Sequence, residues 1–136
     1  MNIQVRYYTR SGNTRKVAEA IAKACSVQAK SIPEPLEGKA DILFLGASEY
    51  AGNMDKEAEN YINSLNKDQV KKVVIFTTSA GTKKVYPKAC ALLKEKEIPV
   101  DERYFYCHGK FLFMHKDQPN EEDLKAAEEF ARSIIK

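Results

Sequence analysis

Segments with the pattern of β-strands alternate with segments with the pattern of α-helices along the whole chain. Residues 41–48 and 71–79 are almost continuously apolar after their first residues and end in small or hydroxyl side chains, as strands covered on both faces do. Val17, Ala20 and Ile21 instead recur at helical spacing. Strands are predicted over residues 2–7, 26–32, 41–48, 71–79 and 99–107, and helices over residues 15–24, 55–66, 84–97 and 120–136. This order predicts an α/β fold in which helices cover both faces of a doubly wound, five-stranded parallel sheet.

One connection between strands departs from that plan. Only "PEPLEGKA" (33–40) separates the second predicted strand from the third, and its two prolines and one glycine leave room for a turn, not a helix. The corner of the sheet over the first two strands should therefore lack helical cover. Gln4 and Arg6 agree with this, because they place polar groups on one face of a strand that such a sheet normally covers on both faces.

Composition narrows the class of protein. The 136 residues are enough for one domain with a buried core, and we expect a single domain over residues 1–136. No apolar run resembles a signal peptide or approaches membrane-spanning length, so we expect a cytoplasmic protein without membrane contact. Three scattered cysteines without a CxxC pair argue against a disulfide framework and a zinc site. The net charge of +3, with lysines interleaved with glutamates, is typical of solvated helix faces and not of nucleic-acid binding.

The first strand leads directly into a loop that suits an anion. Loops at the carboxyl ends of parallel strands are the usual ligand sites of this fold, and a helix that begins there presents free N–H groups and a positive dipole end. Hydroxyl, glycine and amide residues fill this loop: Thr9, Ser11, Gly12, Asn13 and Thr14. The loop has no lysine for a nucleoside triphosphate, which favours one terminal phosphate. A capped turn without a ligand is the alternative, since these residue types are common in turns.

The hexamer "TRSGNT" (9–14) resembles the phosphate-loop signature of the flavodoxin family, in which Thr/Ser, any residue, Thr/Ser, Gly, any residue and Thr follow one another. "LGASEYAG" (45–52) and "FTTSAGT" (76–82) are similar to the second and third flavin loops of the family, and "FYCHGKF" (105–111) is similar to its ending. The resemblance covers essentially the whole chain. It implies the strand order 2-1-3-4-5, FMN held without a covalent bond, and electron shuttling between redox partner proteins.

The resemblance also implies a role for each loop. The first would wrap the FMN phosphate, mostly through backbone N–H groups: Thr9, Arg10, Ser11, Gly12, Asn13 and Thr14. The second would flank the isoalloxazine, with Tyr50 stacked on it: Ser48, Glu49, Tyr50, Ala51 and Gly52. The third would contact the pyrimidine edge: Thr78, Ser79, Ala80 and Gly81. No catalytic residue and no metal ligand is implied.

The chain departs from the family pattern in three respects. Glu49 stands where the second loop usually has a neutral residue, and the third loop has no aromatic before Tyr86. The second flavin face is therefore either open or covered by Phe111 or Phe113. The third departure is charge, because carriers of this family are typically acidic and this chain is slightly basic.

Three functions stay open at this point. An FMN electron carrier is favoured, because the chain is short and has no insertion to build a nicotinamide pocket. An NAD(P)H-dependent flavin or quinone reductase on the same fold and a flavin-free binding module are the alternatives. Cys107 and His108 follow the last predicted strand, and core packing is favoured over a role for them at the ligand.

Overall fold

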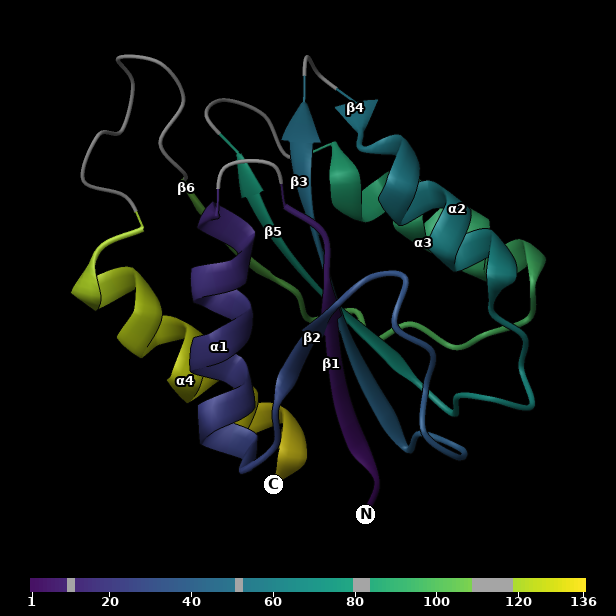
Figure 1. The fold of residues 1–136 in the computed structure, drawn as a ribbon, viewed down its shortest axis with the longest axis horizontal. Helices are drawn as coiled ribbons and strands as arrows, with labels where there is room; N and C mark the ends of the chain where they lie inside the picture. The colour runs from purple at the N-terminus through teal and green to yellow at the C-terminus, as the bar shows by residue number, and fades with distance from the viewer. Residues whose placement is uncertain (10–11, 51–52, 80–83, 109–118) are drawn as a thin grey trace.

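A parallel sheet with helices on both faces forms the protein in the computed structural model, which describes residues 1–9, 12–50, 53–79, 84–108 and 119–136 (Figure 1). The parallel strands are β1 (Ile3–Tyr7), β2 (Ala29–Ser31), β3 (Ile42–Tyr50), β5 (Val73–Ser79) and β6 (Phe105–His108). Their order across the sheet is β2-β1-β3-β5-β6, and the two-residue strand β4 (Asn53–Met54) pairs antiparallel with β3. The predicted order 2-1-3-4-5 of the five parallel strands is confirmed.

The helices lie in two layers. Helices α1 (Asn13–Cys25) and α4 (Glu121–Ile135) cover one face of the sheet, and α2 (Lys56–Ser64) and α3 (Val85–Glu95) cover the other (Figure 1). Alternate residues of each strand enter opposite cores. On β5, Val74 and Phe76 pack under α1 and α4, whereas Val73 and Ile75 pack under α2 and α3. In the part of the chain that the structure describes, no helix is both long enough and apolar enough to cross a membrane.

Two helices begin with side-chain caps. Asp55 accepts a hydrogen bond from the backbone N–H of Glu57 at the start of α2. Asn120 and Asp123 each bind the other's backbone N–H at 2.9 Å and form a capping box at the start of α4. Acidic side chains in the first turn of both helices interact favourably with the positive end of the helix dipole.

Two predicted strands are shorter than their sequence patterns indicated. The strand predicted over 26–32 is limited to Ala29–Ser31, because α1 ends in a turn with Ser26 at a left-handed φ of 57°. The strand predicted over 99–107 begins only at Phe105, after a single bridge between Val73 and Val100. The Asp101 carboxylate accepts the backbone N–H of Arg103 at 2.8 Å and turns the chain between the bridge and the strand. Strand β4 was not predicted, because two residues carry no periodic pattern.

The connection 33–40 contains no helix, as predicted, but it covers the corner more fully than expected. Arg6 is only 2% exposed, and its guanidinium donates to the main-chain carbonyls of Glu34 (3.0 Å) and Pro35 (2.7 Å). The side-chain amide of Gln4 donates to the carbonyl of Glu37 at 2.8 Å and accepts the backbone N–H of Glu37 at 2.9 Å. Polar side chains of β1 therefore bind the backbone of a segment that has no helical hydrogen bonds of its own.

Candidate functional site

The carboxyl ends of β1, β3 and β5 lie at one edge of the sheet, at the top of Figure 1. The strands are parallel, so the loops that follow them begin side by side. In the register, Tyr7 pairs with Gly46 and Ser48 pairs with Thr78. The three segments that the sequence assigns to a ligand therefore start from the same edge of the sheet, which is where this class of fold binds its ligands.

Gly12 shapes the end of the first loop. Its φ of 91° and ψ of −5° lie in the left-handed region, where glycine has no steric penalty. The Thr9 hydroxyl accepts the Gly12 N–H at 2.9 Å and fixes the turn. A hydroxyl that accepts one hydrogen bond can also donate its own proton. Among the described residues other than its chain neighbours, no atom would lie within 4 Å of a Cβ built on Gly12, so the space on that side of the residue is open. A compact anion could approach the start of α1 from that side.

The electrostatics at the start of α1 also suit an anion. Gly12 is the N-cap residue of α1 and brings no side chain to the helix N–H groups, whereas Asp55 and Asn120 cap α2 and α4. The first turn of α1 carries no acidic residue. The same is true of α3, which begins after the third loop with Lys84 as its N-cap. Neither helix that follows the first or third loop therefore has a carboxylate in its first turn to oppose a bound anion.

A buried hydrogen bond joins the first loop region to the third. Thr14 Oγ1 and Thr78 Oγ1 are 2.9 Å apart, and the two residues are 0% and 1% exposed. Thr14 is the second residue of α1, and Thr78 is the second-last residue of β5. Both residues were candidates from the sequence, but nothing in the sequence predicts that they bind each other, because 64 positions separate them.

The second loop follows the end of β3, where Ser48 and Glu49 lie, and Glu49 pairs antiparallel with Met54 of β4. Several candidate residues lie outside the described residues: Arg10, Ser11, Ala51, Gly52, Ala80 and Gly81. Phe111 and Phe113, the candidate covers of the second flavin face, do so as well. The side chains of Tyr50 and Ser79 are not described either. Stacking of Tyr50 on a flavin therefore stays a prediction.

Tyr86, the first aromatic after the third loop, is engaged elsewhere. Its ring stacks on Tyr104 with centroids 4.1 Å apart and planes inclined by 17°. Its hydroxyl donates to the main-chain carbonyl of Asp101 at 2.9 Å. Burial of the hydroxyl, with the Cys90 thiol beside it, raises the pKa of Tyr86 to about 12. These contacts hold Tyr86 against the segment that precedes β6.

Cys107 packs into the core that α1 and α4 cover, in agreement with the interpretation from the sequence. Burial is the main cause that raises the pKa of the Cys107 thiol to about 12, and the nearby Asp123 carboxylate adds to it. A thiol in this state is a small apolar group and a poor nucleophile.

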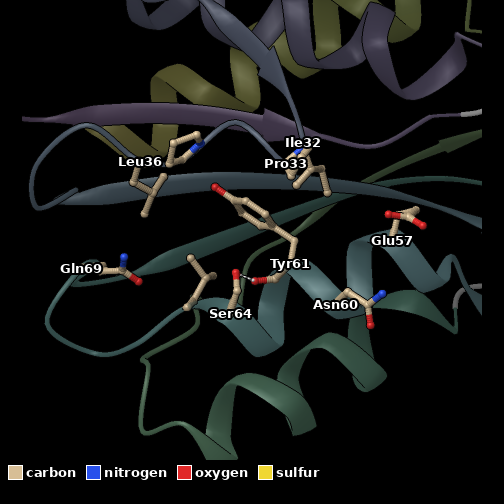
Figure 2. A pocket seen from close by; sticks show the side chains of 10 residues that line it. Ile32, Pro33, Leu36, Glu57, Asn60, Tyr61, Ser64 and Gln69 are labelled. Atoms are coloured by element: carbon tan, nitrogen blue, oxygen red, sulfur yellow. Dashed lines mark hydrogen bonds between the residues drawn. The ribbon is translucent and has the colours of Figure 1, made fainter.

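A groove of about 350 Å³ lies apart from the carboxyl edge, between the 33–40 connection and α2. Figure 2 shows Tyr61 projecting from α2 into this groove, with Pro33 and Leu36 on the opposite wall. The Tyr61 hydroxyl donates to the main-chain carbonyl of Glu34 at 3.0 Å. None of the candidate flavin residues lines the groove, and the sequence indicated it only through the missing helix.

Known proteins share this fold and sequence pattern. A family model described as a flavodoxin domain matches residues 4–113. An uncharacterized protein of Methanocaldococcus jannaschii is 30% identical over 138 aligned positions, which cover 91% of each protein. The structure of a flavodoxin from the domain Archaea matches with a TM-score of 0.80 at 20% identity, over 98% of this chain and 96% of that one. Oxidised flavodoxin 2 from Bacillus cereus matches with a TM-score of 0.72 at 17% identity, over 99% and 98%.

The stretch that matches the family model includes the left-handed Gly12, the antiparallel pairing of β3 with β4 and the end of β5. It also includes most of the parallel sheet on which these features are placed. The chain belongs to the flavodoxin family.

Proposed function

We propose that the protein binds FMN without a covalent bond at the carboxyl edge of the sheet and carries electrons between redox proteins in the cytoplasm. The observation that carries the proposal is the start of α1, where a left-handed Gly12 without a side chain leaves open space beside helix N–H groups. An anion of the size of a phosphate monoester suits this arrangement. Membership in the flavodoxin family supports the choice of FMN among ligands that carry such a group.

Each loop has a part in this binding. The Thr9 hydroxyl would donate its proton to the phosphate. At the same time its oxygen would continue to accept the hydrogen bond from the Gly12 N–H. Ser48 and Glu49, at the end of β3, would lie along the isoalloxazine, and the main chain at Thr78 would face its pyrimidine edge. The cofactor supplies reversible uptake of electrons, and the protein sets its orientation and its exposure to water.

A carrier is favoured over a reductase. Beyond the sheet and its helices, the described part of the chain adds only β4, and it has no further element that could enclose a nicotinamide. Under this proposal a redox partner protein delivers and removes the electrons. The net charge of +3 differs in sign from the overall acidity that steers many carriers to basic partners.

Reduction by nicotinamide cofactors separates the candidate functions. The protein is loaded with excess FMN, freed of unbound FMN by gel filtration and mixed anaerobically with NADH or NADPH. We expect a stable yellow protein whose absorbance persists for many minutes with either nucleotide. After photoreduction, we expect it to reduce cytochrome c rapidly. Direct bleaching by NADPH, with turnover of an added quinone, would favour the reductase. A protein that keeps no FMN would contradict both functions.

A further inference from the structure

The hydrogen bond between Thr14 and Thr78 crosses from the helix layer to the sheet directly behind the first loop. Thr78 projects from β5 on the same face as Val74 and Phe76, which is the face that α1 covers. Thr14 projects from the first turn of α1 to meet it, with the two hydroxyl oxygens 2.9 Å apart. Thr14 is two residues from Gly12, so a constraint on its position also orients the first N–H groups of the helix.

Neither hydroxyl is placed to touch a ligand. Both residues are almost completely inaccessible, at 0% and 1% exposure. One hydroxyl donates to the other, and the burial of both residues keeps the pair away from the surface of the ligand-free protein. The side chains of Thr14 and Thr78 therefore affect the loop in front of them through position, while the ligand contacts proposed for these residues are made by their main chain.

We propose that Thr78 is a positioning residue for the phosphate end of the ligand, although it belongs to the loop that faces the flavin ring. It acts through Thr14: the bond between the hydroxyls holds the first turn of α1 at a fixed place against β5. Without the bond, the start of α1 must be ordered when the phosphate arrives, and that ordering weakens binding. This inference rests on the proposed FMN function and adds to it the residue that positions the phosphate loop.

The test compares FMN with riboflavin, which has the same ring system but no phosphate. Thr78→Val keeps the shape and the main chain of the residue but removes the hydroxyl. We expect its affinity for FMN to fall by roughly tenfold, which corresponds to about 1.4 kcal/mol, while its affinity for riboflavin stays at the parental value. Thr78→Ser retains the hydroxyl and should restore the affinity for FMN. The dissociation constants come from quenching of flavin fluorescence.

Thr77→Val is the matched control. Thr77 is the neighbouring residue, is also buried, at 3% exposure, and projects from the opposite face of β5 toward α2 and α3. The same loss of a buried hydroxyl should leave the affinities for both flavins unchanged. If Thr78→Val binds FMN as tightly as the parent, or loses FMN and riboflavin equally, the positioning role is overturned. A parent protein that binds no FMN would instead overturn the proposed function, and this inference with it.

The ligand-free protein provides a second readout that needs no flavin. In amide NMR spectra without ligand, Thr78→Val should shift or broaden the signals of Gly12 and Asn13, which are far from position 78 in the sequence. Thr77→Val should leave those two signals in place. Unchanged Gly12 and Asn13 signals in Thr78→Val would contradict the inference whatever the flavin affinities are. If Thr78→Val does not fold, Thr14→Val is measured in the same way, again with Thr77→Val as the control. The amide signal of Thr78, near the bond, should then change, and that of Val27, far from it, should not.

Discussion

The guanidinium of Arg6 donates a hydrogen bond to the main-chain carbonyl of Pro35, with Nη2 2.7 Å from the oxygen. Further bonds run from the same side chain to the carbonyls of Glu34 and Val5 and to the side-chain oxygen of Gln4, each at 3.0 Å. Its charge is therefore solvated by peptide and amide dipoles at a position where the fold lacks a helix. Arg6 therefore holds the first part of the connection 33–40 against the sheet, and Gln4 holds the part around Glu37.

Replacement of Arg6 by Leu should destabilise the protein strongly. Leucine fills part of the volume but removes every hydrogen bond that the buried guanidinium makes, including those to the Pro35 carbonyl and the Gln4 side chain. The expected loss is about 2–4 kcal/mol of the free energy of unfolding. Urea unfolding of the ligand-free protein measures the loss. Arg132→Leu is the control, because Arg132 is an exposed residue that pairs with Glu128 one helical turn away, and it should unfold near the parental midpoint. Equal midpoints for the two variants would show that the Arg6 bonds do not hold the connection.

Replacement of Gly12 by Val should abolish FMN binding. The φ of 91° is unfavourable for a β-branched residue, by roughly 1–3 kcal/mol, so the turn must change its shape. Gly38→Val is the control, because Gly38 also has a positive φ, of 69°, but lies in the connection 33–40. We expect both variants to lose stability and only Gly12→Val to lose FMN, as measured by flavin fluorescence. A Gly12→Val protein that binds FMN like the parent would refute the assignment of the phosphate loop.

Asp101 should make stability depend on acid pH. The Arg103 guanidinium, with further help from Lys72, holds the pKa of the Asp101 carboxyl well below its usual range. A carboxyl whose folded pKa is depressed stabilises the protein above its unfolded pKa, near 4, and this stabilisation is lost as the pH falls below that value. Asp101→Asn should therefore be less stable than the parent at pH 7, and the difference should shrink below about pH 4. Unfolding midpoints between pH 7 and pH 3 measure this; a constant difference across the range would contradict it. Asp68→Asn, at an exposed position, controls for the loss of one negative charge.

Cys107 should resist alkylation in the folded protein. With a pKa of about 12, only about one molecule in ten thousand carries the Cys107 thiolate at pH 8, and the side chain is buried. Iodoacetamide at pH 8 should modify the half-buried Cys90 well before Cys107, and urea should make all three cysteines reactive. Peptide mass spectrometry after timed quenching follows each site. Modification of Cys107 as fast as Cys90 would contradict its place in the core.

The periodic parts of the sequence predicted the fold well. Long apolar strands such as 71–79 and amphipathic helices identify themselves, because burial on two faces or on one stripe leaves a regular pattern. Short strands could not be bounded from the sequence, since Ala29–Ser31 depends on pairing with β1 and β4 depends on pairing with β3. The absence of a helix over 33–40 could be predicted from its prolines, but the contact of Arg6 with the carbonyls of that segment could not, because it is made by backbone groups without a side-chain signature.

The candidate site was predictable to the level of loops. The first loop could be placed because a glycine between a strand and a helix often allows a left-handed turn in front of the helix N–H groups. Gly12 has this conformation. The bond between Thr14 and Thr78 was not predictable, since it depends on how α1 lies against β5. The sequence also could not show that the Tyr86 ring is engaged away from the third loop. Its stacking on Tyr104 joins an α3 residue to the segment before β6.

Titration of FMN with the ligand-free protein tests the central claim most directly. FMN fluorescence is followed as protein is added, and riboflavin is titrated in parallel under the same conditions. We expect quenching to an end point of one FMN per chain, with riboflavin bound at least tenfold more weakly, because riboflavin lacks the phosphate that the start of α1 would hold. Unquenched FMN at micromolar protein, or riboflavin bound as tightly as FMN, would contradict the account.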